Sequence, residues 1–300
     1  MTMNGRIRIR ARWPAVWERA VCGVMLFPVF LLSRLPQPLL WATIGRCCYF
    51  FIYSFARYRY QVVVQNLSRS FPEKPYGEIY LLAKDFYRHF SGFVVEMIKS
   101  LSISRRELAG RVHVVNADVL YRYRDEARPM VALLGHYGNW ESLNILPSKL
   151  QMPVNALYKP LSNPSLGRIV MRIRTRFGMQ LIPAGRAVRQ LMGAKSGASL
   201  NLFIADQFPG RGKGHRMELL HQPTTLFDGA EKLAKAIDAV VLYVELEKNT
   251  DSGWNVHFSL ITDRPNETAE GQITESFGRR LQQTIQKQPA YWLWSHKRWK

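Results

Sequence analysis

The pattern of apolar and polar residues changes near residue 60. Before that point apolar side chains are dense, and Glu18 is the only acidic residue. After it, short apolar runs alternate with amphipathic stretches, and no repeat or low-complexity block interrupts them. Such alternation is typical of an α/β domain with a mixed central sheet flanked by helices. We therefore expect a basic, apolar N-terminal segment over residues 1–60 and one folded domain over residues 61–300.

The spacing of apolar residues predicts the elements of that domain. Helices are expected at residues 62–69, 77–101, 164–177, 187–195, 229–237 and 270–288. Strands are expected at residues 130–135, 154–158, 179–183, 199–205, 217–221, 240–247 and 254–262. Because helices and strands interleave along the chain, the sheet is expected to be mostly parallel or mixed.

The N-terminal segment consists of two short apolar arms around a bend. The first arm, residues 20–33, has 14 uncharged residues, whereas an untilted bilayer crossing needs roughly 20. The second, residues 35–56, is interrupted by Arg46, and the sequence RLPQP between the arms is a turn signal. Arginines flank both arms, which favours keeping both ends on the cytoplasmic side. We expect a shallow hairpin or interfacial membrane anchor; a single span and a buried helix pair are the alternatives.

Charge and cysteine content narrow the class of partner and of site. The chain has 42 basic and 22 acidic residues, a net charge of +20, which predicts an acidic partner. Anionic lipid, nucleic acid, an acidic carrier protein and a phosphorylated substrate all fit that sign. Its 3 cysteines, at positions 22, 47 and 48, form no C-x-x-C pattern, so a disulfide framework is excluded and a thiolate zinc site is not expected.

Residues 131–141, VALLGHYGNWE, join an apolar strand to a polar loop. Ligands of open α/β sheets bind at the carboxyl ends of strands, which is where His136 is expected. Asn139 is a suitable N-cap for a helix that begins at Trp140, and a bend at Gly138 could bring His136 and Glu141 together. An imidazole paired with a carboxylate is suited to removing a proton from a hydroxyl group.

Other catalytic motifs are missing from the sequence. It contains no G-x-S-x-G elbow, no P-loop and no H-E-x-x-H. Direct attack of an acceptor hydroxyl on an activated acyl group therefore fits the residues that remain. By itself, a histidine five positions before a glutamate is equally compatible with a structural histidine.

The segment GHYGNWE, residues 135–141, resembles the H-x4-D/E motif of glycerolipid and lysophospholipid acyltransferases. Its fuller form, H-[FY]-G-N-W-E, resembles the lipid A late acyltransferases, the lauroyl and myristoyl transferases. Further pieces resemble this family in the same order, at residues 64–67 with 70–73, 158–160 with 163–164, 172–174, 205–207, 227–230 and 292–300. The resemblance covers nearly the whole chain.

The resemblance implies transfer of a fatty acyl chain from an acyl carrier protein, or from coenzyme A, to a hydroxyl of a lipid A precursor. No covalent acyl-enzyme intermediate is expected. His136 would be the general base and Glu141 would orient it. Because direct transfer needs no prosthetic group, no cofactor and no metal are expected, and the thioester donor is a substrate.

Five further residues are expected to bind substrate. Arg174 could clamp a phosphate, and Asp206, at a strand end, could hold Arg174 or a substrate hydroxyl. Backbone amides near Gly135 and Gly138 are candidates for stabilising the oxyanion of the thioester. Asn139 belongs to the same loop.

The expected partners are a membrane lipid acceptor, an acidic acyl carrier protein and the anionic inner-membrane surface, with no nucleic acid. The expected location is the bacterial inner membrane, with the catalytic domain facing the cytoplasm. Residues 205–207 read Ala-Asp-Gln where many glycerol-phosphate acyltransferases have Glu-Gly-Thr, which argues against a simple glycerol-phosphate acceptor. A glycolipid, an amino-acid lipid or a lysophospholipid is the alternative acceptor, and a non-catalytic basic nucleic-acid-binding protein is the alternative of another class.

Two basic segments have two interpretations each. Residues 210–216, GRGKGHR, are either a mobile loop over the lipid or carrier or a surface hairpin turn. The aromatic and basic C-terminal residues 291–300 are either an interfacial belt or part of the core.

Overall fold

The computed structural model describes residues 27–299 except 162, 194–196, 211 and 252. Within them, the core is a seven-stranded sheet. Its strand order is β1 (Val112–Val114), β9 (Trp254–Thr262), β8 (Val240–Lys248), β2 (Met130–Leu134), β5 (Leu200–Ile204), β3 (Val154–Tyr158) and β4 (Gln180–Pro183). Neighbouring strands are parallel except β8 and β9, which are antiparallel. The expected mixed α/β architecture is confirmed.

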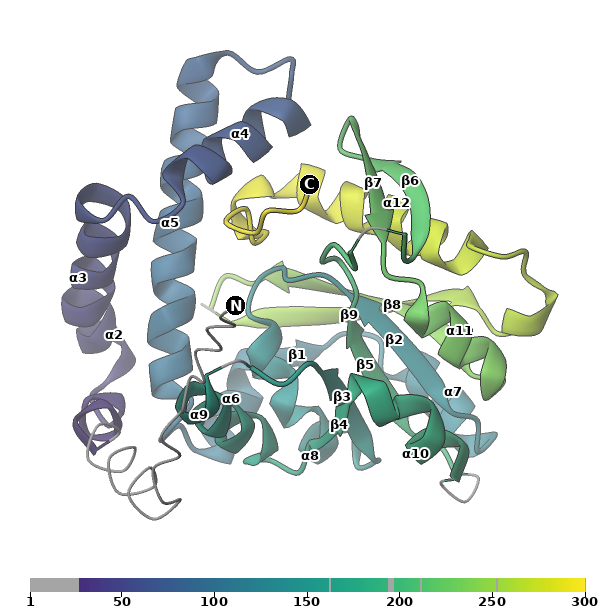
Figure 1. Cartoon of the computed structure of the whole chain (residues 1–300). Coiled ribbons are helices and arrows are strands. Elements are labelled where there is room, and N and C mark those ends of the chain that lie inside the picture. The colour runs from purple at the N-terminus through teal and green to yellow at the C-terminus, as the bar shows by residue number, and fades with distance from the viewer. Residues whose placement is uncertain (1–26, 162, 194–196, 211, 252, 300) are drawn as a thin grey trace, which may run out of the picture.

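Burial explains why β2 lies inside the sheet. Its sequence, MVALL, contains no polar residue, and all its residues are buried. A strand that is covered on both faces reads as a continuous apolar run instead of an alternating one. Helices cover the sheet: Figure 1 shows α12 (Gln272–Lys287) above it and α8 (Leu146–Leu150), α9 (Pro164–Thr175) and α10 (Ala187–Gly193) below it.

The expected helices are present with shifts of a few residues at their ends. They are α4 (Tyr60–Ser70), α5 (Tyr76–Lys99), α9, α10, α11 (Gly229–Ala236) and α12. One strand differs in its partner: β6 (His215–Leu219), expected at residues 217–221, pairs with β7 (Gln222–Leu226) in a separate hairpin. Short elements were not expected from the sequence, namely α6 (Arg105–Arg111), β1, α7 (Asp118–Asp125), α8 and β7.

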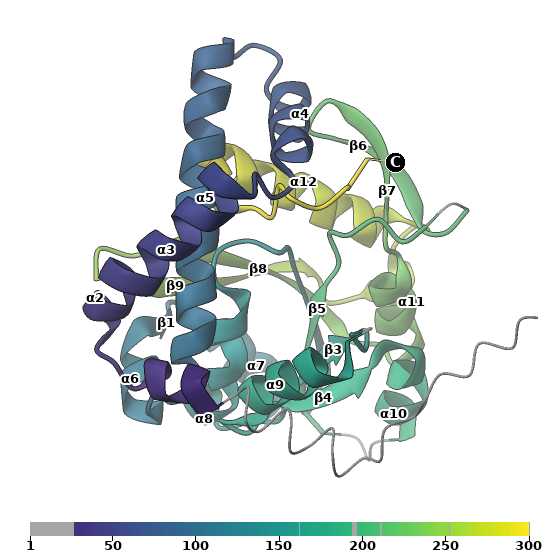
Figure 2. The same cartoon turned by 60° about the vertical axis from the view of Figure 1, so that its left-hand side comes forward.

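The bend in the N-terminal segment is present where it was expected. Residues 27–33 are helical, residues 34–36 turn, and a second helix runs from Gln37 to Phe55. This second helix comprises α2 (Gln37–Leu40), η1 (Trp41–Gly45), α3 (Arg46–Tyr49) and η2 (Phe50–Phe55). It lies alongside α5 (Figure 2). Trp41 packs against Gly92 of α5, where an added Cβ atom would lie 2.3 Å from the indole. The beginning of the first arm, residues 20–26, lies outside the described residues.

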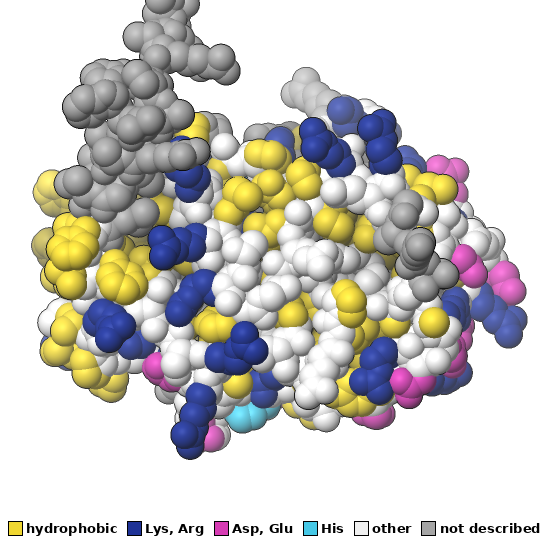
Figure 3. All heavy atoms as spheres, turned by 90° about the horizontal axis from the view of Figure 1, so that it is seen from below, with side chains coloured by type: hydrophobic (Ala, Val, Ile, Leu, Met, Phe, Trp, Pro, Cys, Tyr) yellow, Lys and Arg dark blue, Asp and Glu magenta, His cyan; other side chains and the backbone are white. Residues whose placement is uncertain are grey.

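No single helix of the described residues is long and apolar enough to span a membrane. The helix Gln37–Phe55 and α4 satisfy the length and composition criteria only as a pair, and they are bent by 83°. The helix Gln37–Phe55 also exposes large apolar side chains, including Phe50, Phe51 and Phe55. In Figure 3 apolar side chains gather at the left, the side on which α2 and α3 lie in Figure 1, with Lys and Arg side chains beside them.

Candidate active site

His136 lies where the sequence predicts, in the loop that follows β2. The loop starts at Gly135, where a Cβ atom would lie 2.6 Å from Leu281 of α12 and 3.4 Å from an oxygen of Asp206. Because a side chain would collide with α12, glycine at this position lets the loop approach both groups. The Asp206 carboxylate, which follows β5, thereby reaches the neighbouring histidine.

A buried carboxylate holds the imidazole of His136. Nδ1 lies 2.6 Å from Oδ1 of Asp206, and the backbone N–H of His136 donates to Oδ2 at 2.8 Å. The indole N–H of Trp292 donates to the same Oδ2 at 2.8 Å. Burial would raise the pKa of Asp206, but His136 and these hydrogen bonds lower it to about 2.

The ionised carboxylate fixes the tautomer of the histidine. A carboxylate without a proton can only accept hydrogen bonds, so Nδ1 of His136 carries a proton. Nε2 is then the basic nitrogen in the neutral imidazole, and it lies 3.4 Å from the amide nitrogen of Gln207. The His136 side chain is 18% exposed, whereas that of Asp206 is 3% exposed.

Glu141 pairs with Arg174. The guanidinium of Arg174, on α9, donates from Nε at 2.8 Å and from Nη2 at 2.5 Å to the two oxygens of Glu141. The indole N–H of Trp140 also donates to Glu141, at 3.2 Å. The Glu141 side chain is 6% exposed and that of Arg174 is 23% exposed. Such a bidentate pair, largely removed from water, is a strong and directional contact.

These pairings differ from the expected ones. We expected Glu141 to orient His136, and Asp206 to hold Arg174 or a substrate hydroxyl. In the structure Asp206 is the carboxylate in hydrogen-bond contact with the imidazole, and Glu141 is the partner of Arg174. The reason lies in the chain path. Glu141 is in the first turn of η3 (Trp140–Ile145), which contacts α9, whereas β5 is hydrogen-bonded to β2 and ends beside its loop.

Gly138 makes the bend that the sequence predicts. Its φ is +63°, a left-handed conformation that favours glycine, and a Cβ atom would lie 2.6 Å from the ring of Trp254. Its backbone N–H donates to the carbonyl oxygen of Tyr291 at 3.0 Å. That N–H is therefore already committed to the C-terminal segment.

Asn139 is the N-cap of η3, as expected, although η3 is a 3-10 helix. Its Oδ1 accepts from the backbone N–H of Ser142 at 3.2 Å, and its Nδ2 donates to Glu96 of α5. Asn139 is buried. These contacts give it a structural role, which is to tie the loop to α5.

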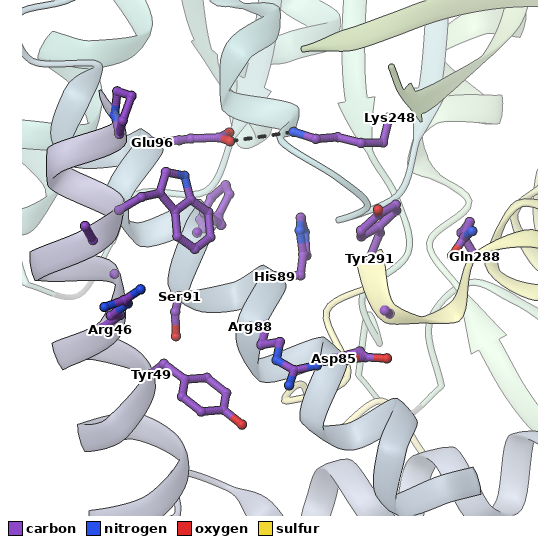
Figure 4. A pocket seen from close by; sticks show the side chains of 17 residues that line it. Arg46, Tyr49, Asp85, Arg88, His89, Ser91, Glu96, Lys248, Gln288 and Tyr291 are labelled. Atoms are coloured by element: carbon purple, nitrogen blue, oxygen red, sulfur yellow. Dashed lines mark hydrogen bonds and ion pairs between the residues drawn. The ribbon is translucent and has the colours of Figure 1, made fainter. Parts of the chain in front are cut away.

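Two cavities lie near the site, and His136 is among the lining residues of neither. One of about 30 Å³ lies beside the pair of Glu141 and Arg174, and its lining is mostly apolar, including Leu134, Leu202 and Ile204. A larger one, of about 870 Å³, lies between the N-terminal helix and α5 (Figure 4). Figure 4 labels polar residues of its lining: Arg46, Tyr49, Asp85, Arg88, His89, Ser91, Glu96, Lys248, Gln288 and Tyr291.

Two residues that line the larger cavity, His89 and Glu96, form hydrogen bonds with the loop that contains His136. Glu96 accepts the hydrogen bond of Asn139, and Lys248 lies 4.0 Å from Glu96. His89 hydrogen-bonds the backbone of Gly138; its burial, with a smaller effect of Lys248, lowers its pKa to about 4. His89 is therefore neutral near pH 7. Within the described part of the chain, no cluster of His, Cys, Asp and Glu side chains is placed to hold a metal ion.

Sequence reasoning missed the contribution of Trp292. The sequence carries a signal in the C-terminal aromatic residues, but an interfacial belt and core packing explain them equally well. In the structure Trp292, Trp294 and Arg298 are buried, with exposed fractions of 3%, 0% and 1%. Core packing is therefore the correct interpretation for these three residues.

Comparison with known families shows which family the chain belongs to. The family model of the bacterial lipid A biosynthesis acyltransferases matches residues 10–300. A comparison with curated proteins found no match. The family is one of enzymes that transfer acyl groups, so a non-catalytic protein is excluded. From this match over nearly its whole length, we conclude that the chain is an acyltransferase and belongs to the bacterial lipid A biosynthesis acyltransferase family.

Proposed function

We propose that this acyltransferase moves a fatty acyl chain from an acyl carrier protein thioester to a hydroxyl of a lipid A precursor, with His136 as general base. One observation carries the mechanism. Nδ1 of the imidazole is held 2.6 Å from a buried carboxylate, which leaves Nε2 as the basic nitrogen on a partly exposed side chain. This is the arrangement that general-base catalysis requires.

The proposed step transfers one acyl group without a covalent enzyme intermediate. Nε2 takes the proton of the acceptor hydroxyl while the hydroxyl oxygen attacks the thioester carbonyl carbon. A carbon–oxygen bond forms, the carbon–sulfur bond breaks, and the imidazolium returns the proton to the leaving thiolate. Asp206 stabilises the imidazolium during this cycle. General-base catalysis contributes about 10²- to 10⁴-fold, so the thioester oxyanion must also be stabilised.

We assign Glu141 and Arg174 to substrate positioning. Glu141 engages Nε and Nη2 of the guanidinium, which leaves further N–H donors for a substrate phosphate. Arg174 is partly exposed, as a ligand contact requires. For the oxyanion, the backbone near Gly135 is the better candidate, because the N–H of Gly138 already donates to Tyr291.

The proposed setting is the cytoplasmic face of the bacterial inner membrane. Two features support it: the exposed apolar side chains of the helix Gln37–Phe55 and the net charge of +20. An anionic membrane surface and an acidic carrier protein both fit this charge. In this proposal residues 1–60 form the anchor and residues 61–300 the catalytic domain. The enzyme uses no cofactor and binds no nucleic acid.

The test uses the purified full-length protein with an acyl carrier protein thioester and a Kdo-bearing lipid A precursor. Release of free thiol is followed, and mass spectrometry identifies the acylated lipid. H136A should lower turnover at least about 10²-fold while its circular dichroism spectrum stays unchanged. Full turnover by H136A would contradict the mechanism. Acylation of a lysophospholipid or an amino-acid lipid, with none of the lipid A precursor, would overturn the acceptor.

A further inference from the structure

We infer that Trp292 is a positioning residue for the acyl transfer: its indole N–H holds Asp206 in the orientation that fixes His136. This inference rests on the proposed function. Trp292 does not touch the reacting atoms, so its effect must pass through Asp206. It belongs to the C-terminal segment, 86 positions away from that carboxylate.

Three donors fix the Asp206 carboxylate. Oδ1 faces Nδ1 of His136 at 2.6 Å, while Oδ2 accepts from the backbone N–H of His136 and from the Trp292 indole, both at 2.8 Å. Two donors on Oδ2 from opposite segments prevent rotation of the carboxylate about its Cβ–Cγ bond. Without the indole, both remaining donors to Asp206 belong to His136. If His136 moves, these donors move with it, so they cannot fix Asp206 independently of the histidine.

The backbone of the same segment fixes the catalytic loop. The N–H of Leu293 donates to the carbonyl oxygen of His136 at 3.1 Å, and the N–H of Gly138 donates to the carbonyl oxygen of Tyr291 at 3.0 Å. Tyr137 and Trp292 form an isolated antiparallel bridge between these bonds. The segment therefore sets the position of the indole relative to the histidine as well as relative to the aspartate.

The segment is itself anchored at a distance from the site. Asn66 of α4 donates to the carbonyl oxygens of Trp294 and His296 at 2.8 and 3.0 Å. Further along, Arg298 donates to the carbonyl oxygen of Thr225 in β7 at 2.8 Å. Because these anchors come from α4 and β7, the indole is pre-positioned before any substrate binds, as an effective catalytic support requires.

Electrostatics gives the indole a measurable effect. Burial alone would raise the pKa of Asp206, and the hydrogen bond from Trp292 is among the contacts that lower it. With one donor fewer, the buried carboxylate is less well stabilised, so the pKa of Asp206 rises from its lowered value.

The test compares W292F with W294F in the full-length protein. Trp294 is a control in the same segment: it also loses an indole hydrogen bond, to the carbonyl oxygen of Pro289 at 2.7 Å, and its ring packs edge-to-face on that of Trp292, but its indole N–H donates to Pro289 and not to Asp206. W292F should lower kcat about 10- to 100-fold, the effect of one lost hydrogen bond to a charged group, with KM within about twofold. W294F should retain kcat within about threefold at an equal or larger loss of thermal stability.

The contact between Nδ1 of His136 and Asp206 separates positioning from a merely structural role. For W292F the NMR signal of the Nδ1 proton of His136 should shift or broaden, because the carboxylate that accepts this proton is held less firmly, whereas W294F should leave the signal in place. If phenylalanine unfolds the segment, β-(3-benzothienyl)alanine inserted at position 292 preserves the indole shape without an N–H donor and should give the same two changes. An unchanged kcat and an unchanged Nδ1 proton signal in both variants would overturn the inference.

A double-mutant cycle tests the route through Asp206. In a D206N background, W292F should change kcat less than about twofold, because the indole acts through the carboxylate. A full, independent loss in that background would contradict the inference. If H136A and D206N themselves keep full activity, the proposed function fails instead; if they lose it while W292F keeps it, only the role of Trp292 fails.

Discussion

Two buried carboxylates of the site, Asp206 and Glu141, pair with different kinds of basic side chain. Asp206 faces an imidazole that can gain and lose a proton, whereas Glu141 faces a guanidinium whose charge is permanent. The first pair can respond to the chemistry, and the second can only fix a position. Of these two residues, the carboxylate nearer in sequence to the histidine is therefore not the one in contact with it.

The largest expected effect breaks the first pair. D206N replaces an acceptor-only carboxylate by an amide, which no longer fixes the Nδ1–H tautomer of His136. In a catalytic triad the same change costs about 10⁴-fold in kcat, and we expect a loss on the order of 10³- to 10⁴-fold here. Steady-state thiol release measures it. A loss below tenfold would show that Asp206 does not support the base.

The second expected effect breaks the other pair. E141Q leaves the Arg174 guanidinium, 23% exposed, without its counter-charge, and removing one partner of a buried pair costs about 3–5 kcal/mol. Because Arg174 is partly hydrated, we expect the lower end of that range. Chemical denaturation measures it, with R122A as a control, since Arg122 and its partner Glu126 are both exposed. Equal stability of E141Q and the parent would contradict a structural pair.

The third prediction is a loss of folding stability at low pH that depends on His89. The pKa of His89 is lowered from 6.5 to about 4 in the folded chain, so the unfolded chain binds the proton more readily. This contribution to stability is complete above pH 6.5 and is lost as the pH falls from 6.5 to 4, by about 3 kcal/mol. Asp206, whose pKa falls from 3.8 to about 2, loses its contribution only below pH 3.8. Denaturation of H89F against pH should lack the first loss; the same loss in H89F would assign it elsewhere.

The smallest expected effect concerns the bend of the loop. G138A should destabilise the fold by about 1–3 kcal/mol, because alanine is strained at φ +63° and its Cβ atom would meet Trp254. G110A is the matched control, since nothing lies within 4 Å of a Cβ atom at that position in α6, and it should be neutral or stabilising by up to about 1 kcal/mol. Thermal melting of both variants decides the comparison. Equal behaviour would show that the bend tolerates a side chain.

Long elements were predictable because their signal is local. The apolar stripe of α5 and the continuous apolar run of β2 are readable from a few adjacent residues. The short elements α6 and β1 were not, because seven and three residues contain too little periodicity. The hairpin of β6 and β7 shows a further limit. The apolar pattern near residue 217 predicts a strand, but it does not indicate which strand pairs with it.

In the site, too, local features were predictable from the sequence and long-range contacts were not. His136 and the Asn139 cap follow from the local sequence, because a strand end and a capping residue are local features. The contacts of Asp206 with His136 and Trp292 join residues 70 and 86 positions apart. Such contacts depend on strand order and on the path of the C-terminal segment, and no local pattern encodes either.

Nitrogen-15 NMR of the His136 imidazole in the full-length protein tests directly which carboxylate holds the base. We predict a protonated Nδ1 with a strongly downfield proton in the parent, its loss in D206N and its retention in E141Q. Retention in D206N together with loss in E141Q would contradict this prediction, because Glu141 would then be the carboxylate that holds the base.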